Sequence, residues 1–248
     1  MQINIRRGAD TIGGTAVELT ANNGDRIILD LGLPLDAEEN TAALLPDIKG
    51  LTAKIPDLKG LFISHSHQDH FSLGKHIDPA IPIYMGKAVD TIIKATADYL
   101  TKAKEALPDL ELPEMFSFKN VRHIEGFVPV QVGAFKVTPY PVNHAAYESF
   151  AFLVEADGKR IFYTGDFRNH GRTNKRTEHL ISNPPSDIDV LLMEGSSIER
   201  LNPDEHFETE EELEKRMAEV FRNTRGLCMA HSSSQNIDRI VTIYRAAK

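Results

Sequence analysis

The chain has 248 residues, of which 41% are apolar and 26% charged; this composition fits a single globular α/β domain and excludes a disordered or fibrous protein. Its 28 basic and 36 acidic residues give a net charge of −8, which argues against a uniformly basic nucleic-acid-binding surface. One cysteine, Cys228, excludes an internal disulfide, and the sequence shows neither a signal core nor a membrane-length apolar run, so we expect a cytoplasmic protein without a membrane partner.

Short or alternating apolar runs predict β-strands in the first third of the chain, at residues 15–20, 26–31, 61–64 and 81–85. The first two runs flank Asn22-Asn23-Gly24-Asp25, a turn sequence typical of a hairpin. Apolar residues then recur at helical spacing from 87 to 107 and predict a helix, which Pro108 ends.

Hairpins continue in the middle of the chain. Runs at 130–132 and 135–142 turn at Gly133-Ala134, and runs at 150–156 and 159–164 turn at Asp157-Gly158. The remaining predicted elements are a strand at 189–194, a helix at about 208–222, a strand at 226–230 and a helix from Asn236 to the end of the chain.

The acidic excess is concentrated in residues 204–214, which hold seven carboxylates and no lysine or arginine. We interpret this segment as a solvated face near a helix N-terminus, where carboxylates interact favourably with the helix dipole. Because the rest of the chain is close to neutral, the net charge does not exclude an anionic substrate.

A cluster of histidines follows the predicted strand at 61–64, in Ser64-His65-Ser66-His67-Gln68-Asp69-His70. Alternation directs His65 and His67 to the same side, and a turn into a helix places Asp69 and His70 one step further along. Imidazole and carboxylate ligands suit zinc, and also manganese or iron. The cluster therefore indicates a loop that can serve two metal ions.

Further ligands are expected at the ends of other strands. His144 ends the second predicted hairpin, and Asp166 ends the third, where Gly165 allows a sharp turn. Either residue alone is more typical of a structural role. Their shared position at strand ends, like that of the histidine cluster, favours a common metal site.

The His-x-His-x-Asp-His cluster, a later strand-end histidine and a Thr-Gly-Asp after an apolar strand resemble the metallo-β-lactamase superfamily over almost the whole chain. The resemblance implies an α/β fold, a four-layer αβ/βα sandwich, with a dinuclear Zn²⁺ site along the sheet edge. It assigns His65, His67 and His144 to one zinc ion, Asp69 and His70 to the other, and Asp166 to a bridging position. It also implies hydrolysis by a hydroxide that two metal ions activate.

Three features favour phosphodiester substrates. The first is the segment 167–177, which carries Arg168 and Arg172 and no acid. Planar guanidinium groups beside Asp166 could hold phosphate oxygens; an exposed basic helix start is the alternative.

The second feature is Glu194, which follows an apolar strand and precedes Gly-Ser-Ser. It is similar to the first acidic motif of the β-CASP nucleases, the subgroup that includes RNase J. The resemblance makes Glu194, with Asp69, a catalytic candidate, against a solvated glutamate as the alternative.

The third feature is the segment after 226, which resembles the point where β-CASP proteins leave the lactamase-type domain. Ser232, Ser233 and Ser234 would then offer hydroxyl and backbone N–H groups to an anion at a helix N-terminus, with a plain N-cap as the alternative. The resemblance divides the chain into a catalytic domain at 1–230 and the truncated start of an inserted β-CASP-like domain at 231–248, which leaves the sandwich incomplete at its C-terminus.

RNA is the substrate that this subgroup implies, and a homo-oligomer is left open. Two alternatives remain. A compact small-molecule hydrolase, such as a thioesterase or lactonase, would use His231 as the late histidine ligand that the family requires. A catalytically silent binding module of the same fold would need no complete site. The remaining histidines are expected to be structural or solvent-facing: His76, His123, His170, His179 and His206.

Overall fold

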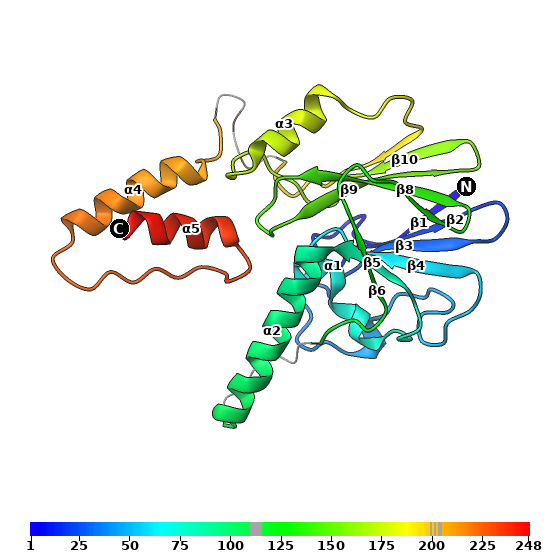
Figure 1. Ribbon diagram of the computed structural model, residues 1–248, viewed down its shortest axis with the longest axis horizontal. Helices are drawn as coiled ribbons and strands as arrows, with labels where there is room; N and C mark the ends of the chain where they lie inside the picture. The colour runs from blue at the N-terminus through cyan, green and yellow to red at the C-terminus, as the bar shows by residue number, and fades with distance from the viewer. Residues whose placement is uncertain (110–115, 199, 201, 203–204) are drawn as a thin grey trace.

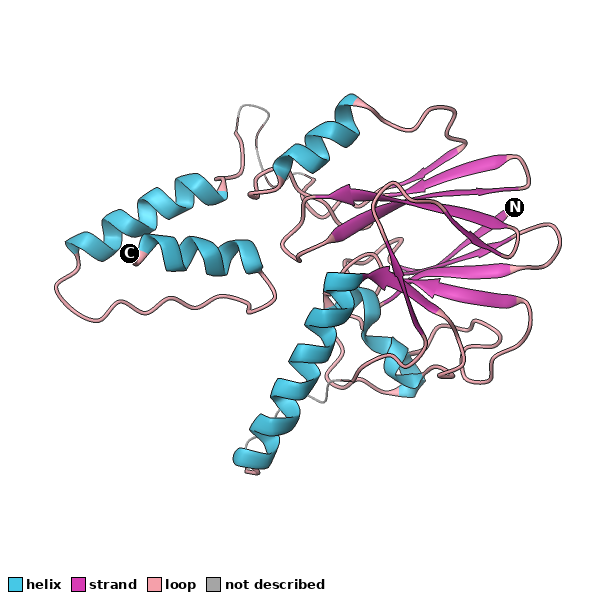
Figure 2. Ribbon diagram, viewed as in Figure 1, coloured by secondary structure: helices cyan, strands magenta, loops and turns pink. Residues whose placement is uncertain are grey.

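The computed structural model describes residues 1–109, 116–198, 200, 202 and 205–248. Two β-sheets face each other, and helices lie on the outer side of each sheet (Figures 1 and 2). This arrangement confirms the α/β class and the αβ/βα layering that the sequence predicts. None of the helices among these residues is both long and apolar enough to cross a bilayer.

The first sheet runs in the order β1-β2-β3-β4-β5-β6. Its strands are Gln2–Arg7, Ala16–Thr20, Arg26–Leu31, Leu58–Phe62, Ile83–Gly86 and Val121–Ile124. The predicted hairpin at 15–20 and 26–31 is confirmed as β2 and β3. From β3 to β6 the strands are parallel, so their carboxyl ends lie at the same edge of the sheet.

The second sheet runs in the order β11-β10-β9-β8-β7. In that order the strands are Val190–Leu192, Lys159–Tyr163, Ser149–Ala156, Phe135–Val142 and Val130–Val132. Both predicted hairpins are confirmed, because β7 pairs with β8 and β9 pairs with β10, each antiparallel. The last strand, β11, runs parallel to β10.

The helices are α1 to α5, at Gln68–Phe71, Lys87–Ala106, Asn174–Ser182, Glu210–Asn223 and Ile237–Ala246. Short 3-10 segments lie at Ala42–Leu44 and Ser72–His76. The predictions of α2, α4 and α5 are confirmed. Thr209 begins α4 with a capping box, in which its hydroxyl accepts from the Glu212 N–H and the Glu212 carboxylate accepts from the Thr209 N–H.

Three apolar clusters separate the four layers. Between the sheets, Phe62 of β4 packs edge-on against Phe152 of β9. Outside the first sheet, Val89 and Ile93 of α2 join a second cluster. Outside the second sheet, Leu180 of α3 packs against a smaller third cluster. Helices α4 and α5 lie together at one end of the sandwich rather than over a sheet face (Figure 1).

The predicted strand at 226–230 is wrong. This segment lies in the irregular connection between α4 and α5, and Leu227 and Met229 are each 87% exposed. A strand requires a neighbour that accepts and donates its backbone hydrogen bonds, and no described strand pairs with this segment. Its apolar sequence therefore forms no β-structure here.

Candidate metal centre

The histidine cluster lies where the two sheets meet at their edge. His65 and His67 follow β4, and Asp69 and His70 lie in the short helix α1. The loop is tied to the second sheet, since the Phe150 N–H of β9 donates to the Ser64 carbonyl at 3.0 Å. The ends of β8 and β10 supply His144 and Asp166 to the same edge. Residues far apart in the sequence thus converge.

Three imidazoles form a first potential ligand group: His65, His67 and His144. The Nδ1 atom of His67 lies 3.1 Å from Nε2 of His65 and 3.1 Å from Nε2 of His144. Nitrogen ligands at about 2.0–2.1 Å from a tetrahedral zinc ion are about 3.3 Å apart. The spacing of these nitrogen atoms therefore fits one ion at their centre.

All three imidazoles favour the neutral form that binds metal. Burial lowers the pKa of His65 well below its ordinary value, and the neighbouring histidines lower it further. Burial also lowers the pKa of His67 and brings the pKa of His144 to about 3. At neutral pH these side chains therefore offer unprotonated nitrogen atoms.

A second potential ligand group consists of His65, His70 and Asp166. The Oδ2 atom of Asp166 lies 3.4 Å from Nε2 of His70 and 3.8 Å from Nε2 of His144, so this carboxylate lies near both groups. The Asp69 carboxylate lies 3.7 Å from Nε2 of His70. The structure thus brings together all six predicted ligands, and their division between two ions stays a prediction.

The surroundings of His70 stabilise positive charge. Burial alone would lower the pKa of His70, but the charges of Asp30 and Asp166 outweigh it and hold the pKa well above its ordinary value. Burial would raise the pKa of Asp166, yet its hydrogen bond and charge interaction with His70 keep that pKa below its usual range. A site that stabilises an imidazolium between carboxylates also suits a divalent cation.

Asp30, at the end of β3, was missed by the sequence reasoning. Its carboxylate is fully buried and accepts from the Ser64 N–H at 2.7 Å and from the Tyr163 hydroxyl at 2.6 Å. It also lies 2.8 Å from Nδ1 of His70, which leaves Nε2 of that ring facing Asp166. The available signal was a single acid within the apolar run Arg26–Leu31.

Glu194 lies just beyond β11 and supports the loop that carries Asp166. Its carboxylate accepts from the Phe167 N–H at 2.9 Å and from the Ser196 hydroxyl. Both Glu194 and Asp166 line a cavity of about 600 Å³, together with Asp69. The catalytic roles predicted for Glu194 and Asp69 stay predictions.

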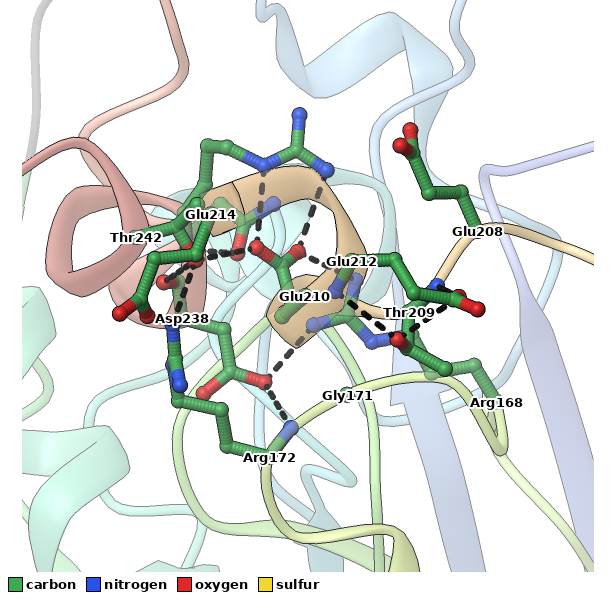
Figure 3. A network of polar contacts seen from close by, with 12 residues as sticks. Arg168, Gly171, Arg172, Glu208, Thr209, Glu210, Glu212, Glu214, Asp238 and Thr242 are labelled. Carbon is green, nitrogen blue, oxygen red and sulfur yellow. Dashed lines mark hydrogen bonds and ion pairs between the residues drawn. The ribbon is translucent and has the colours of Figure 1, made fainter. Parts of the chain in front are cut away.

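Arg168 and Arg172 extend toward α4 and α5, where acidic side chains surround their guanidinium groups (Figure 3). Both guanidinium charges are paired with carboxylates. The phosphate contacts predicted for Arg168 and Arg172 stay a prediction.

The interpretation of residues 204–214 as a solvated face is wrong for Glu210, which is 1% exposed and pairs with Arg239 at 3.1 Å. Asp204 lies outside the described residues.

The predicted serine site lies in the connection between α4 and α5. Ser233 accepts from the Gln235 N–H through its hydroxyl at 3.3 Å, and Asn236 caps α5 by accepting from the Arg239 N–H. Ser232 and Ser234 lie beside it, in the same connection. His231 is exposed in this connection and belongs to neither ligand group among the described residues. The anion-binding role of the serines stays a prediction.

Comparisons with known proteins identify the family of most of the chain. Residues 26–226 match the family described as "Beta-lactamase superfamily domain". The chain is similar to ribonuclease J of Mycoplasma genitalium, with 22% identity over 89% of this chain and 37% of the relative. It is also similar to cleavage and polyadenylation specificity factor subunit 3 of Dictyostelium discoideum, with 23% identity over 76% of this chain and 25% of the relative.

A solved structure shares the fold over nearly the whole chain. It is the crystal structure of an Enterococcus faecalis V583 protein of unknown function, with a TM-score of 0.74, 25% identity, and coverage of 97% of this chain and 62% of that one. The chain spans little more than a third of the length of the curated ribonuclease J relatives that it matches. From its matched residues and its fold, the chain belongs to the β-lactamase superfamily domain family, and its homologues include ribonuclease J and cleavage and polyadenylation specificity factor subunit 3.

Proposed function

We propose that the chain is the metal-binding part of a zinc-dependent ribonuclease of the β-CASP type. The observation that carries the proposal is the pair of ligand groups that share His65 at the edge of the two sheets. The similarity to proteins named ribonuclease J and cleavage and polyadenylation specificity factor subunit 3 supports RNA as the substrate.

In this proposal, His65, His67 and His144 hold one ion, while Asp69 and His70 hold the second and Asp166 contacts both. Neutral imidazoles combined with carboxylates are a donor set typical of zinc. Two such ions would supply a hydroxide at neutral pH and stabilise the charge that develops on phosphate oxygens. Asp30 fixes the orientation of the His70 ring, which makes one ring nitrogen available to the ion.

The cavity of about 600 Å³ beside Asp69 and Asp166 is where we place the RNA backbone. Glu194, which also lines this cavity, holds the Asp166 loop through the Phe167 N–H and is the candidate for proton transfer. We place another phosphate contact at the serines at 232–234.

We also propose that residues 231–248 begin a further domain. The protein would act in the cytoplasm, where its single cysteine would stay reduced.

Metal content and RNA cleavage test the proposal together. We expect the purified protein to bind two zinc ions, and Asp69→Ala to lose one of them. His206→Ala is the matched control, because His206 is 78% exposed and lies outside both ligand groups. The substrates to compare are a 5′-phosphorylated single-stranded RNA and a set of thioesters. Hydrolysis of thioesters without RNA cleavage would contradict the nuclease proposal and favour a small-molecule hydrolase.

A further inference from the structure

Asn143, the residue before His144, is held on all its polar groups by the segment that follows Asp166. Its carbonyl accepts from the Arg168 N–H at 2.7 Å, and its own N–H donates to the Thr177 hydroxyl at 2.9 Å. Its side-chain amide donates to the Thr173 hydroxyl at 2.6 Å and accepts from the Gly171 N–H at 3.1 Å. Asn143 is buried, so these bonds have no competition from water. The position of His144 therefore depends on residues 168–177.

Asp238 of α5 also holds this segment. Its Oδ2 atom accepts from the Arg168 guanidinium at 2.9 Å and from the Arg172 N–H at 3.1 Å. Asp238 and His144 also line the same small cavity. One carboxylate of the C-terminal helix thus contacts the segment that fixes Asn143.

Gly171 lies between these two side chains. A Cβ atom at this position would come within 2.5 Å of the Asn143 amide oxygen and within 2.6 Å of Asp238 Oδ2. The segment therefore fits the space between Asn143 and Asp238 only without a side chain at position 171. Figure 3 shows Gly171 in the chain between Arg168 and Arg172.

The helix pair that carries Asp238 is itself anchored by charged side chains, among which Glu210 is buried. Glu210 of α4 accepts from the Arg239 guanidinium and from the Thr242 hydroxyl of α5, and its N–H donates to the His170 carbonyl at 3.0 Å. The Arg172 guanidinium donates to Thr242 at 2.9 Å and to Glu214. Helices α4 and α5 are thereby fixed to residues 168–172 as one unit (Figure 3).

We propose that Asp238 is a positioning residue for the metal centre, acting through residues 168–172 and Asn143 on His144. The proposal rests on the proposed metal site. Arg168 lies two positions after Asp166 in the chain, so the same contact also limits the movement of that carboxylate. The C-terminal helix pair, which contributes no ligand among the described residues, in this way sets the geometry of the ligands.

The physical reason is that, among the described residues, the Arg172 N–H has no hydrogen-bond acceptor other than Asp238. Arg168 Nε and Arg172 Nε are already buried without a hydrogen-bond partner among the described residues. Removal of the Asp238 carboxylate would leave the Arg172 N–H without its acceptor and the Arg168 guanidinium with only the longer ion pair to Glu210, at 3.7 Å. Residues 168–172 would shift toward another acceptor, and the bonds to Asn143 would shift with them.

The test measures Co²⁺ bound in place of zinc, because its visible absorption reports the ligand geometry. In Asp238→Ala we expect Co²⁺ affinity to fall at least tenfold, with a changed visible spectrum. Asp238→Asn keeps an oxygen acceptor for the Arg172 N–H. Its Co²⁺ affinity and visible spectrum should therefore lie between those of Asp238→Ala and the wild type. Gly171→Ala, which displaces the segment by contact rather than by charge, should reproduce the spectrum of Asp238→Ala.

Arg239→Gln is the matched control. It removes an ion pair to Glu210 within the helix pair, and among the described residues its side chain makes no hydrogen bond or ion pair to residues 168–177. We expect it to lower the melting temperature while leaving Co²⁺ affinity and spectrum unchanged. Circular dichroism identifies any variant that fails to fold, and the histidine ring NMR signals of the metal-free protein provide a second readout for His144.

Two negative results are distinguishable. Wild-type protein that binds no Co²⁺ would overturn the proposed metal site and this proposal together. Wild-type protein that binds Co²⁺, with folded Asp238→Ala and Gly171→Ala that bind it equally well and with unchanged spectra and His144 signals, would overturn the positioning role alone.

Discussion

Asp30 shows how a single buried side chain orders the metal centre. It adopts a left-handed backbone conformation, with φ of 55°, which aspartate tolerates better than most residues. Its carboxylate then faces the loop after β4 and accepts from Ser64 twice, through the backbone N–H and the hydroxyl, both at 2.7 Å. The same carboxylate fixes His70, so one residue holds both the ligand loop and a ligand.

Replacing Asp30 should therefore affect both stability and metal binding. We expect Asp30→Ala to lower the free energy of unfolding by about 3–5 kcal/mol, because it leaves buried polar partners uncompensated. Urea denaturation measures this change. Tyr163→Phe removes only one of the four contacts and should cost about 1 kcal/mol. Equal losses in the two variants would show that the carboxylate is not the organising group.

Gly32 lies against the backbone of the ligand residues Asp69 and His70. A Cβ atom there would lie 1.6 Å from the Asp69 carbonyl oxygen, so the backbone of Asp69 and His70 must move in Gly32→Ala. We expect a loss of about 1–3 kcal/mol in stability and a loss of metal affinity of about tenfold, the scale seen when ligand supports are disturbed. Denaturation and Co²⁺ titration measure the two effects.

Gly226→Ala is the control for Gly32→Ala, since a Cβ atom at position 226 meets no atom within 4 Å. Gly226→Ala should change neither the stability nor the Co²⁺ affinity. Unaltered Co²⁺ binding in Gly32→Ala would mean that the α1 backbone adjusts without displacing the ligands.

Among the elements, α4 shows what a charge pattern can and cannot predict. The sequence correctly places a helix at about 208–222, and the structure begins it at Glu210 after a capping box. The acidic pattern predicts exposure because most carboxylates are solvated. It cannot show that Arg168 and Arg239 surround Glu210, because these partners come from distant parts of the sequence.

The burial of Glu210 predicts an acid-sensitive contact. Burial would raise the pKa of Glu210, but hydrogen bonds from Arg239 and Thr242 outweigh it and lower the pKa below its ordinary value of 4.5. The ionised carboxylate therefore stabilises the fold fully above about pH 4.5. This contribution disappears as the pH falls below 4.5 and through the lowered pKa.

Urea denaturation between pH 3 and pH 7 tests this contact in the wild type and in Glu210→Gln. The difference in unfolding free energy between the two should be largest near neutral pH and should shrink in acid. The exposed pair Glu208–Arg216 supplies a control, because Glu208→Gln should give a small difference at every pH. A difference for Glu210→Gln that does not vary with pH would contradict the ion-pair role.

Strand prediction succeeded where burial patterns were strong. The hairpins β2–β3, β7–β8 and β9–β10 have clear turns and buried faces, and the sequence predicts each of them. The edge strands β1 and β6 were missed because most of their side chains are at least partly exposed and show no apolar pattern. The segment at 226–230 has the pattern without a pairing partner, and pairing decides whether a strand forms.

For the whole molecule, the sequence predicted the types of ligand, and the fold brought them together. The spacing within 65–70 is local and can be read directly. The approach of His144 and Asp166 depends on the pairing of β8, β9 and β10. Only the motif resemblance predicted this approach from the sequence. The roles of Asp30 and Asn143 were not predicted, because they arise only from contacts with residues distant in the sequence: His70 and Tyr163 for Asp30, and the segment 168–177 for Asn143.

Because the ligands come from both sheets, a bound metal ion should stabilise the molecule as a whole. His65 follows β4 of the first sheet, and His144 follows β8 of the second, so one ion would join the two. A ligand that binds only the folded state at 100 times its Kd adds about 2.7 kcal/mol of stability. For a chain of this size, that raises the melting temperature by about 5–10 °C.

Thermal unfolding with zinc and with a chelator tests this coupling. The wild type should show the full increase, and His144→Ala, which loses the only ligand that β8 contributes among the described residues, should show a much smaller one. His206→Ala should retain the wild-type response, because its ring is solvent-exposed and remote from the ligand groups. An increase of the same size in His144→Ala and the wild type would mean that zinc stabilises the protein at another place, since an ion bound by one sheet alone would not need this histidine.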